Sequence, residues 1–341
     1  MSINENSKTK RPDIGGQAVL EGVMMKAPDH IAVAVRRPNG DIVVKRDAYS
    51  SPAKKHKWMG LPFIRGAVNM GLMMQLGMNV LTASGEMSGI MDEEPSRFEK
   101  WLAKKLGKGV DKVVMGVAIV LALVLSTGLF VLLPNLPAKA LRGAGWSLLS
   151  VNLISGLIRI FILIGYLMFC GLIPDMRKTF QYHGAEHKTV YAHEAQVELT
   201  PQNAQTYSRL HPRCGTSFLL ITFVFSILFF SSMDQVILSL SGYDMASNYL
   251  LRISSRLLML PLVAGISYEI LKSLAHADSK FARALRWPGL QLQRLTTKEP
   301  TLEMLEVAIA SMQSALGDLP QGEKTQEGYA LIKKVQTAPA A

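Results

Sequence analysis

Long apolar runs in the middle of the chain are its dominant pattern. A helix needs about 20 apolar residues to cross the hydrocarbon layer of a membrane. We therefore expect four transmembrane helices, over residues 113–133, 151–174, 217–233 and 257–274. The stretch 236–251 is interrupted by Gly242, Asp244 and Asn248, which predicts a loop with a short interfacial helix. Arg159 stands alone inside the second run, where it is expected to snorkel outward or to pair with an acid in a structural role.

The distribution of Lys and Arg gives these spans a direction. Eighteen precede the first span, five lie between the second and third, and nine follow from Lys272 onward, whereas the other two loops carry two each. Because positive side chains accumulate in cytoplasmic loops, both termini and the His-rich loop 175–215 are expected in the cytoplasm. In a bacterium this predicts a multi-pass protein of the plasma (inner) membrane.

The residues ahead of the first span, 1–112, predict a basic cytoplasmic α+β unit. Two β-rich runs within 31–48 flank Asn39 and Gly40, a pair that favours a hairpin with a type I′ turn. Two strands alone are marginal, so residues 15–25 are expected to add sheet, with their glycines serving turns or close packing rather than phosphate binding.

Residues 58–86 are apolar on most of their surface, and two interpretations of this stretch stay open. One is a buried helix of the cytoplasmic unit. The other is a helix in the membrane interface, with the basic residues 54–57 near the lipid headgroups and Trp58 at the boundary.

Composition and charge narrow the class of protein. Hydrophobic residues make up 49% of the chain and charged residues 18%, yet the net charge is +11, so the basic residues must lie outside the apolar runs. The two cysteines, Cys170 and Cys214, lie in an apolar run and a polar loop, which argues against a disulfide framework. The polar N-terminus predicts no cleaved signal peptide.

The candidate chemistry lies in the His-rich loop, where His183, Glu186 and His187 form a His-x-x-Glu-His string. Residues four apart share one face of a helix, so the two imidazoles could grip one metal ion. In the inverted zinc-hydrolase motif the two His bind zinc and the Glu activates water. The string thus predicts a metal site for zinc or another divalent ion, with Glu186 as the catalytic base.

A third ligand is needed, and several candidates remain open. His211 and Cys214 immediately precede the third span, and Glu269 lies near the cytoplasmic end of the fourth. Glu194 and His193 are local alternatives. If His211 and Cys214 both joined His183 and His187, the site would be a closed structural one without an activated water.

The last predicted part is a cytoplasmic tail, 275–341, after the membrane domain 113–274. Apolar residues recur at helical spacing within 301–317, which predicts an amphipathic helix capped by Thr301. From about Gln321 the chain is polar and is expected to be disordered.

Six strings in this sequence resemble the YqhQ-like family, a domain-of-unknown-function family of bacterial membrane proteins. They are GGQAVLEGVMMK at 15–26, RGAVNMGLMMQLGMNVL at 65–81, YHGAEHKTVYAHE at 182–194, HPRCGTSFLL at 211–220, YEI at 268–270 and PGLQLQRLTTKEP at 288–300. The resemblance implies a predicted metal-dependent enzyme, and gene neighbours in the family imply a role near protein synthesis. It places motif positions at His183, Glu186, His187, His211, Cys214 and Glu269.

Two functions are consistent with these patterns. The first is a membrane-embedded, zinc-dependent hydrolase that acts on a membrane-proximal peptide or a lipid-linked substrate, with Arg213 or Lys188 neutralising developing charge. The second is a non-enzymatic membrane factor that docks the ribosome or the protein translocon through its basic cytoplasmic surface, with the His/Cys cluster as a structural metal site.

Overall fold

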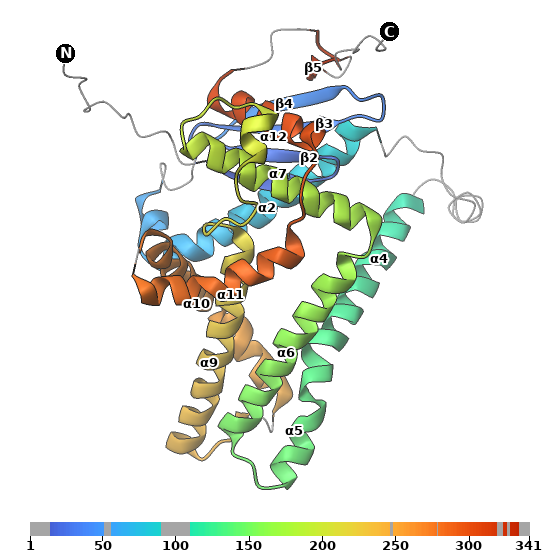
Figure 1. Ribbon diagram of the computed structural model, residues 1–341. Helices are drawn as coiled ribbons and strands as arrows, with labels where there is room; N and C mark the ends of the chain where they lie inside the picture. The colour runs from blue at the N-terminus through green and yellow to red at the C-terminus, as the bar shows by residue number, and fades with distance from the viewer. Residues whose placement is uncertain are drawn as a thin grey trace, which may run out of the picture.

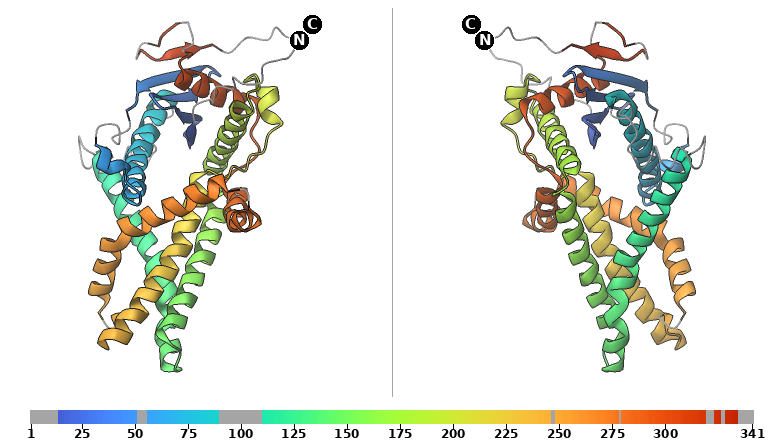
Figure 2. Two further views of the ribbon diagram at one scale, coloured as in Figure 1. Left: turned by 90° about the vertical axis from the view of Figure 1, so that its left-hand side faces the viewer. Right: turned by 90° about the vertical axis from the view of Figure 1, so that its right-hand side faces the viewer.

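The computed structural model describes residues 14–50, 56–89, 110–245, 248–277, 279–318, 323–325 and 328–333. A bundle of long helices forms one part of the molecule, and a small sheet covered by helices forms the other (Figure 1). The first and last described stretches, 14–50 and 328–333, both belong to the sheet part (Figures 1 and 2).

Four helical stretches are long and apolar enough to cross a membrane, in agreement with the predicted number. The first is Gly116–Gly143, which comprises most of α4 (Val110–Thr127), a π-helical segment η3 (Gly128–Leu132) and α5 (Leu133–Gly143). The others lie in α6 (Leu148–Cys170), α9 (Gly215–Ser241) and α10 (Tyr249–His276). Large apolar side chains such as Leu121, Phe161 and Leu258 are exposed on these helices, as contact with lipid would require.

The predicted loop over 236–251 is wrong. Residues up to Ser241 continue α9, Gly242 ends that helix with a φ of 70°, and α10 begins at Tyr249. The polar residues that suggested a loop are accommodated at the helix ends, since the Asn248 side chain caps α10 by accepting a hydrogen bond from the Leu251 N–H.

The sheet contains five antiparallel strands in the order β1-β2-β3-β4-β5. Their bounds are Gly15–Val19, Gly22–Lys26, His30–Arg36, Ile42–Ala48 and Ala330–Ile332. The predicted hairpin and the strands added by 15–25 are therefore present. β5 comes from the part of the tail that was expected to be disordered, which is a correction, because its backbone pairs with the free edge of β4.

The turn between β3 and β4 differs from the predicted type I′. Gly40 has a φ of 90°, but Asn39 is not among the residues with positive φ. The Gly40 N–H donates to the Arg37 carbonyl, and the Arg37 N–H donates to Asp41. A type I turn followed by a left-handed glycine fits this pattern, so glycine is required at one position and not two.

Helices cover both faces of the sheet. Alternate residues of the strands, including Val23, Met25 and Ala34, pack on one face against α7 (Pro174–Glu194) and α12 (Leu302–Leu316). The opposite alternation, including Met24, Val33 and Val35, packs against α2 (Ile64–Ser88). Because the strands are apolar on both faces, they need two layers of cover.

Three segments that are far apart in the sequence thus pack into one body. The N-terminal strands, α7 of the His-rich segment and α12 of the tail share a single core. The short helix α8 (Pro201–Gln205) adds Ala204 to this core, whereas η1 (Lys57–Gly60), which precedes α2, buries no residue. By sequence, these segments belong to a predicted N-terminal unit, a loop and a tail, and their described residues pack together in this core.

Helix α11 (Lys280–Thr296) runs across the junction between the sheet body and the bundle (Figure 1). It exposes Phe281, Leu285 and Trp287, while Leu292 and Gln293 are buried. The two ends of the bundle are therefore different: one carries the sheet body and α11, and the other consists of helix ends and short connections (Figure 2).

Candidate metal centre

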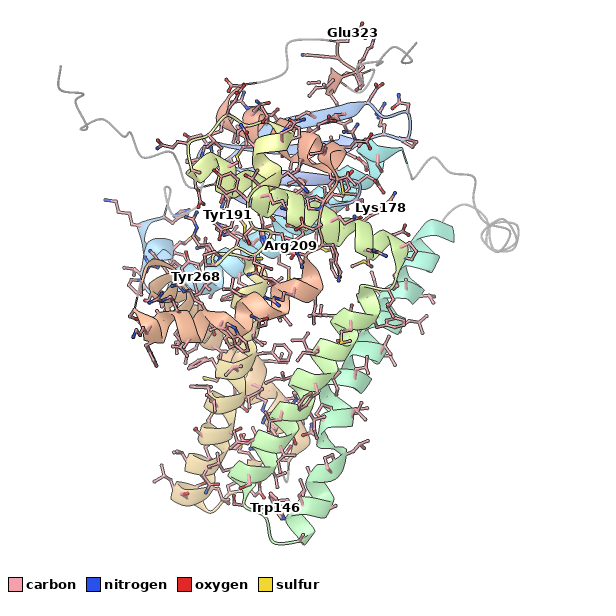
Figure 3. All side chains as sticks on the ribbon, viewed as in Figure 1. Trp146, Lys178, Tyr191, Arg209, Tyr268 and Glu323 are labelled. Carbon is pink, nitrogen blue, oxygen red and sulfur yellow. The ribbon has the colours of Figure 1, made fainter. Side chains whose placement is uncertain are left out.

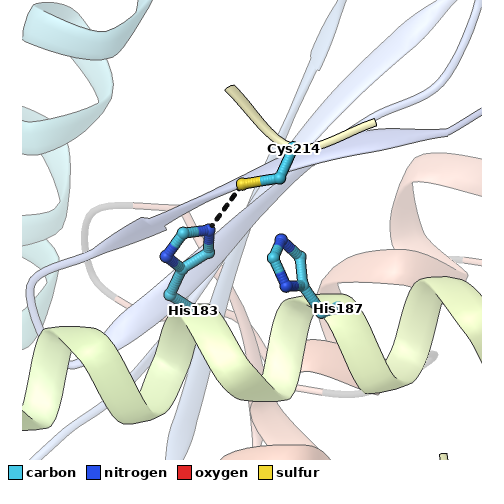
Figure 4. A group of neighbouring side chains, drawn as sticks. All are labelled: His183, His187 and Cys214. Atoms are coloured by element: carbon cyan, nitrogen blue, oxygen red, sulfur yellow. Dashed lines mark hydrogen bonds between the residues drawn. The ribbon is translucent and has the colours of Figure 1, made fainter. Parts of the chain in front are cut away.

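His183 and His187 occupy one face of α7, as predicted from their spacing. Their ring centroids lie 4.5 Å apart. Cys214, the residue before α9, faces both rings, and its Sγ lies 3.2 Å from His183 Nε2 (Figure 4). One ligand atom from each of the three residues lies within 4.8 Å of the other two. The fold thus brings together three groups of the types that bind zinc.

Backbone carbonyls fix the tautomer of both imidazoles. His183 Nδ1 lies 2.9 Å from the Thr296 oxygen, and His187 Nδ1 lies 2.6 Å from the Arg209 oxygen. A carbonyl oxygen only accepts, so both Nδ1 atoms must carry the proton and donate it. The Nε2 atoms then keep their lone pairs for a ligand, an arrangement that is typical of metal-binding histidines.

Cys214 is held by the start of α9, the third candidate span. Its Sγ caps α9 by accepting from the Thr216 N–H at 3.5 Å, and it lies 3.2 Å from Thr216 Oγ1. The positive end of a helix dipole favours negative charge at this position. Since a thiolate is the form of cysteine that binds metals, the cap suits Cys214 for ligation.

Glu186 is buried beside the cluster, with Oε2 at 3.8 Å from His183 Nε2. Burial raises the pKa of the Glu186 carboxyl, and nearby His183, His211 and the Gly16 N–H oppose that rise. A Cβ on Gly16 would lie 2.6 Å from Glu186 Cγ and 2.8 Å from its Oε1. Glycine at position 16 is therefore needed for close approach of β1 to this carboxylate.

His211 lies next to the cluster but is not one of the three converging groups. Its ring centroid is 5.7 Å from that of His187, its Nδ1 accepts from the Arg213 N–H, and its Nε2 lies 3.5 Å from Glu194 Oε1. Gln293 fixes its backbone, accepting from the His211 N–H and donating to its carbonyl, each at 2.8 Å. Burial lowers the pKa of both His211 and His187, so both rings stay neutral near pH 7.

Glu269 is held elsewhere, which corrects the prediction that it could be the third ligand. Both of its oxygens face Arg65 at 2.5–2.7 Å, and Oε1 also accepts from the Phe63 N–H. This ion pair joins α10 to α2 instead of reaching α7. Its partner, Arg65, was visible in the sequence only as an isolated charge in an apolar helix.

Two further predicted roles lose their geometric support. Lys188 donates to the carbonyls of Gln205 and Tyr207, and lies 3.1 Å from Glu299. Arg213 is paired with Glu194. Both positive groups are engaged by other partners, so neither is placed as the charge-neutralising group.

The groups that orient the cluster could not be recognised from the sequence. Two are backbone carbonyls, of Arg209 and Thr296, and no side-chain pattern marks them. Arg209 and Tyr191 lie where the sheet body meets the bundle, and Trp146 lies at the far end of the molecule (Figure 3). The cluster therefore occupies the junction of the two parts, on the sheet side.

The fold and the site together define a class of protein. It has a sheet body joined to four candidate membrane helices, with a buried His/His/Cys cluster at the junction. The chain belongs to the family described as protein of unknown function (DUF1385), whose model matches residues 61–318. It is 34% identical over 311 residues to the uncharacterized protein YqhQ of Bacillus subtilis (strain 168), across 89% of this chain and 92% of that protein. No solved structure matches the chain.

The family resemblance expected from the six motifs is thereby confirmed. Neither description assigns an activity, a metal or a partner. The expectation of a metal-dependent enzyme therefore has no support from these relatives, and it depends on the geometry of His183, His187 and Cys214 alone.

Proposed function

We propose that this protein binds a zinc ion, or another divalent metal, through His183, His187 and Cys214. The observation that carries the proposal is the convergence of three ligand atoms within 4.8 Å, with both imidazoles bonded to carbonyls through Nδ1. Three protein ligands leave one position of a tetrahedral ion free, which is the pattern of catalytic zinc sites.

Glu186 supports a hydrolase as the function of this site. It follows His183 by three residues, directly precedes His187, and its carboxylate is buried beside the ligands. A bound metal would polarise a carbonyl or phosphoryl oxygen and acidify a water molecule. The Glu186 carboxylate, which is buried beside the ligands, would accept the proton of that water.

The position of the cluster supports a substrate presented at the membrane surface. The two histidines lie in the middle of α7, which packs on the sheet, and Cys214 is the N-cap of α9, a candidate span. The Lys and Arg distribution favours the cytoplasmic face for this junction. We therefore favour a membrane-proximal peptide or a lipid-linked molecule as the substrate class.

A structural metal site is the second candidate, and one observation favours it. The cluster joins three separate parts of the chain, because His183 of α7 contacts Cys214 before α9 and the Thr296 carbonyl at the end of α11. A metal here would fasten the sheet body to the bundle. The basic sheet-side surface could then dock the ribosome or the translocon without any catalysis.

Metal analysis of the purified protein tests the proposal. Wild type in detergent should contain about one equivalent of zinc by plasma mass spectrometry, and His183→Ala and Cys214→Ser should lose most of it. Cys170→Ser is the matched control, since Cys170 is buried in α6 outside the cluster. Equal metal content in the Cys214 and Cys170 variants would contradict the site.

Glu186→Gln separates the two candidate functions. The amide keeps the size of the side chain and removes no ligand, so bound zinc should stay at the wild-type level. If the site is catalytic, this variant should fail to complement a deletion strain. Full complementation by Glu186→Gln, together with loss of metal and stability in His183→Ala, would instead favour the structural site.

A further inference from the structure

A second polar cluster lies inside the bundle, at the end away from the sheet. Asp234, near the end of α9, is fully buried, and its Oδ2 accepts from Arg252 at 3.0 Å and from Arg256 at 3.1 Å, both on α10. The Asn152 amide of α6 donates to the same oxygen at 3.0 Å, and the Asn152 Oδ1 accepts from Arg252 at 2.6 Å. Charged groups inside a membrane span are costly and commonly mark a functional site.

A third arginine approaches from the neighbouring span. Arg159 of α6 donates from Nε to the Phe130 carbonyl at 3.2 Å. Phe130 lies in the π-helical segment η3, whose wider turn changes the helical hydrogen-bond pattern. Arg159 thus contacts the first candidate span and lines the same cavity as Arg252 and Arg256.

The three arginines line one cavity of about 40 Å³. The remaining polar groups of its wall are hydroxyls and amides, from Asn135, Asn152, Ser155, Ser226 and Ser231. No acidic residue is among the lining residues, because Asp234 lies behind Arg252 and Arg256. The space exceeds the roughly 10–15 Å³ that a single buried water requires, so a small polyatomic group fits.

The charges of this cluster do not balance. Arg252 and Arg256 share the single carboxylate of Asp234, and in a low-dielectric layer the excess positive charge of this pair is expensive. Arg252 Nε and Arg256 Nε are buried and have no hydrogen-bond partner among the described residues. The guanidinium of arginine matches oxyanions through parallel N–H bonds, and hydroxyl and amide donors complete such a site.

We propose that this cavity binds the phosphate of an anionic phospholipid headgroup. A phosphate would supply the missing negative charge and accept hydrogen bonds from several donors of the wall at once. Arg256 lines the cavity and keeps 24% of its side-chain surface exposed, so this wall of the cavity lies near the molecular surface. Lipid is the source that the location favours, because the arginines belong to candidate spans and lie near the ends of α9 and α10.

Native mass spectrometry of the purified full-length protein tests this assignment. Titration with phosphatidylglycerol should give bound lipid in preference to phosphatidylcholine. Arg256→Gln should reduce the retained phosphatidylglycerol about tenfold, as expected when a charge-assisted contact is lost. Arg142→Gln is the matched control: Arg142 lies at the same end of the bundle, pairs with Asp244 and does not line the cavity.

Thermal unfolding of the wild type keeps the test valid if Arg256→Gln does not fold. Phosphatidylglycerol should raise the unfolding temperature of the wild type and of Arg142→Gln, while phosphatidylcholine should not. Equal responses to both lipids, or equal retention by the two variants, would overturn the proposal. Stabilisation by inorganic phosphate without any effect of phosphatidylglycerol would also overturn it, because the ligand would then be a soluble anion.

Discussion

At the residue scale, the chemistry of this protein depends on single contacts between distant segments. Glu186 owes its position to Gly16, which lies on β1 and leaves just enough room for the carboxylate. The Thr296 and Arg209 carbonyls set the tautomers of His183 and His187, respectively. A few substitutions can therefore separate the roles of ligand, base and scaffold.

Gly16→Ala should displace Glu186 without removing a ligand. The added Cβ would overlap the carboxylate, so the variant should keep its zinc but lose complementation, as Glu186→Gln does. Gly15→Ala is the control, because a Cβ there meets nothing within 4 Å. Metal content and growth of the complemented strain provide the two measurements. If both alanine variants behave alike, Gly16 does not position the base.

The buried ring of His211 should make stability depend on pH. Burial lowers its pKa, so below about pH 6.5 the unfolded chain takes up a proton that the folded protein resists. Stability from this residue is complete above that pH and is lost as the pH falls. His211→Gln should therefore lose less thermal stability than wild type between pH 7.5 and 5.5.

The measurement for His211 is the unfolding temperature in detergent at a series of pH values. The exposed residue His56 provides the control, and His56→Gln should keep the wild-type slope. A variant slope equal to that of wild type would show that the proton uptake occurs at other groups.

At the element scale, α2 is the helix whose surroundings the sequence left open. One side packs on the sheet through Val80 and Met87, but Met74 and Met78 on its other surface are exposed. The preceding residues Trp58 and Phe63 are exposed as well. The helix is thus only half covered, which favours the interfacial interpretation over full burial.

Tryptophan fluorescence can locate this region relative to lipid. The test uses a variant in bilayers that retains Trp58 as its only tryptophan. Its fluorescence should be quenched more by lipids brominated near the headgroup than by lipids brominated near the end of the acyl chain. Equal accessibility to an aqueous quencher with and without lipid would place Trp58 in water and contradict an interfacial position.

At the scale of the whole molecule, the sheet body, which contains both the first and the last described strand, lies on one side of four candidate spans (Figure 1). An even number of crossings produces that arrangement. The distribution of Lys and Arg favours the cytoplasm for the side that carries the sheet body. By sequence position, 32 of the 37 Lys and Arg residues lie on this side and four on the other. The His183/His187/Cys214 cluster and the arginine cavity lie at opposite ends of the bundle.

Reporter fusions test this direction. Green fluorescent protein fused to the C-terminus should fluoresce, and alkaline phosphatase fused there should be inactive. The reason is that the first reporter is functional only in the cytoplasm and the second only outside it. Alkaline phosphatase inserted after Gly145, between α5 and α6, should be active. The reverse pattern would place the metal cluster outside the cell and would exclude a cytoplasmic substrate.

The sequence by itself determined the four apolar helices, the hairpin, the face shared by His183 and His187, and the family. These features depend on periodicity and length, which act over neighbouring residues. The sequence does not determine the residues at which the helices end or the type of the β3–β4 turn. A single residue such as Asn39 fits more than one backbone conformation.

Only the tertiary structure decided which distant groups meet. It selected Cys214 over Glu269 as the third member of the cluster, because Arg65 holds Glu269 on α10 and the start of α9 aims Cys214 at α7. It also assembled three arginines around one cavity. Contacts between residues far apart in the chain depend on how the helices and the sheet pack, and local patterns carry no record of that packing.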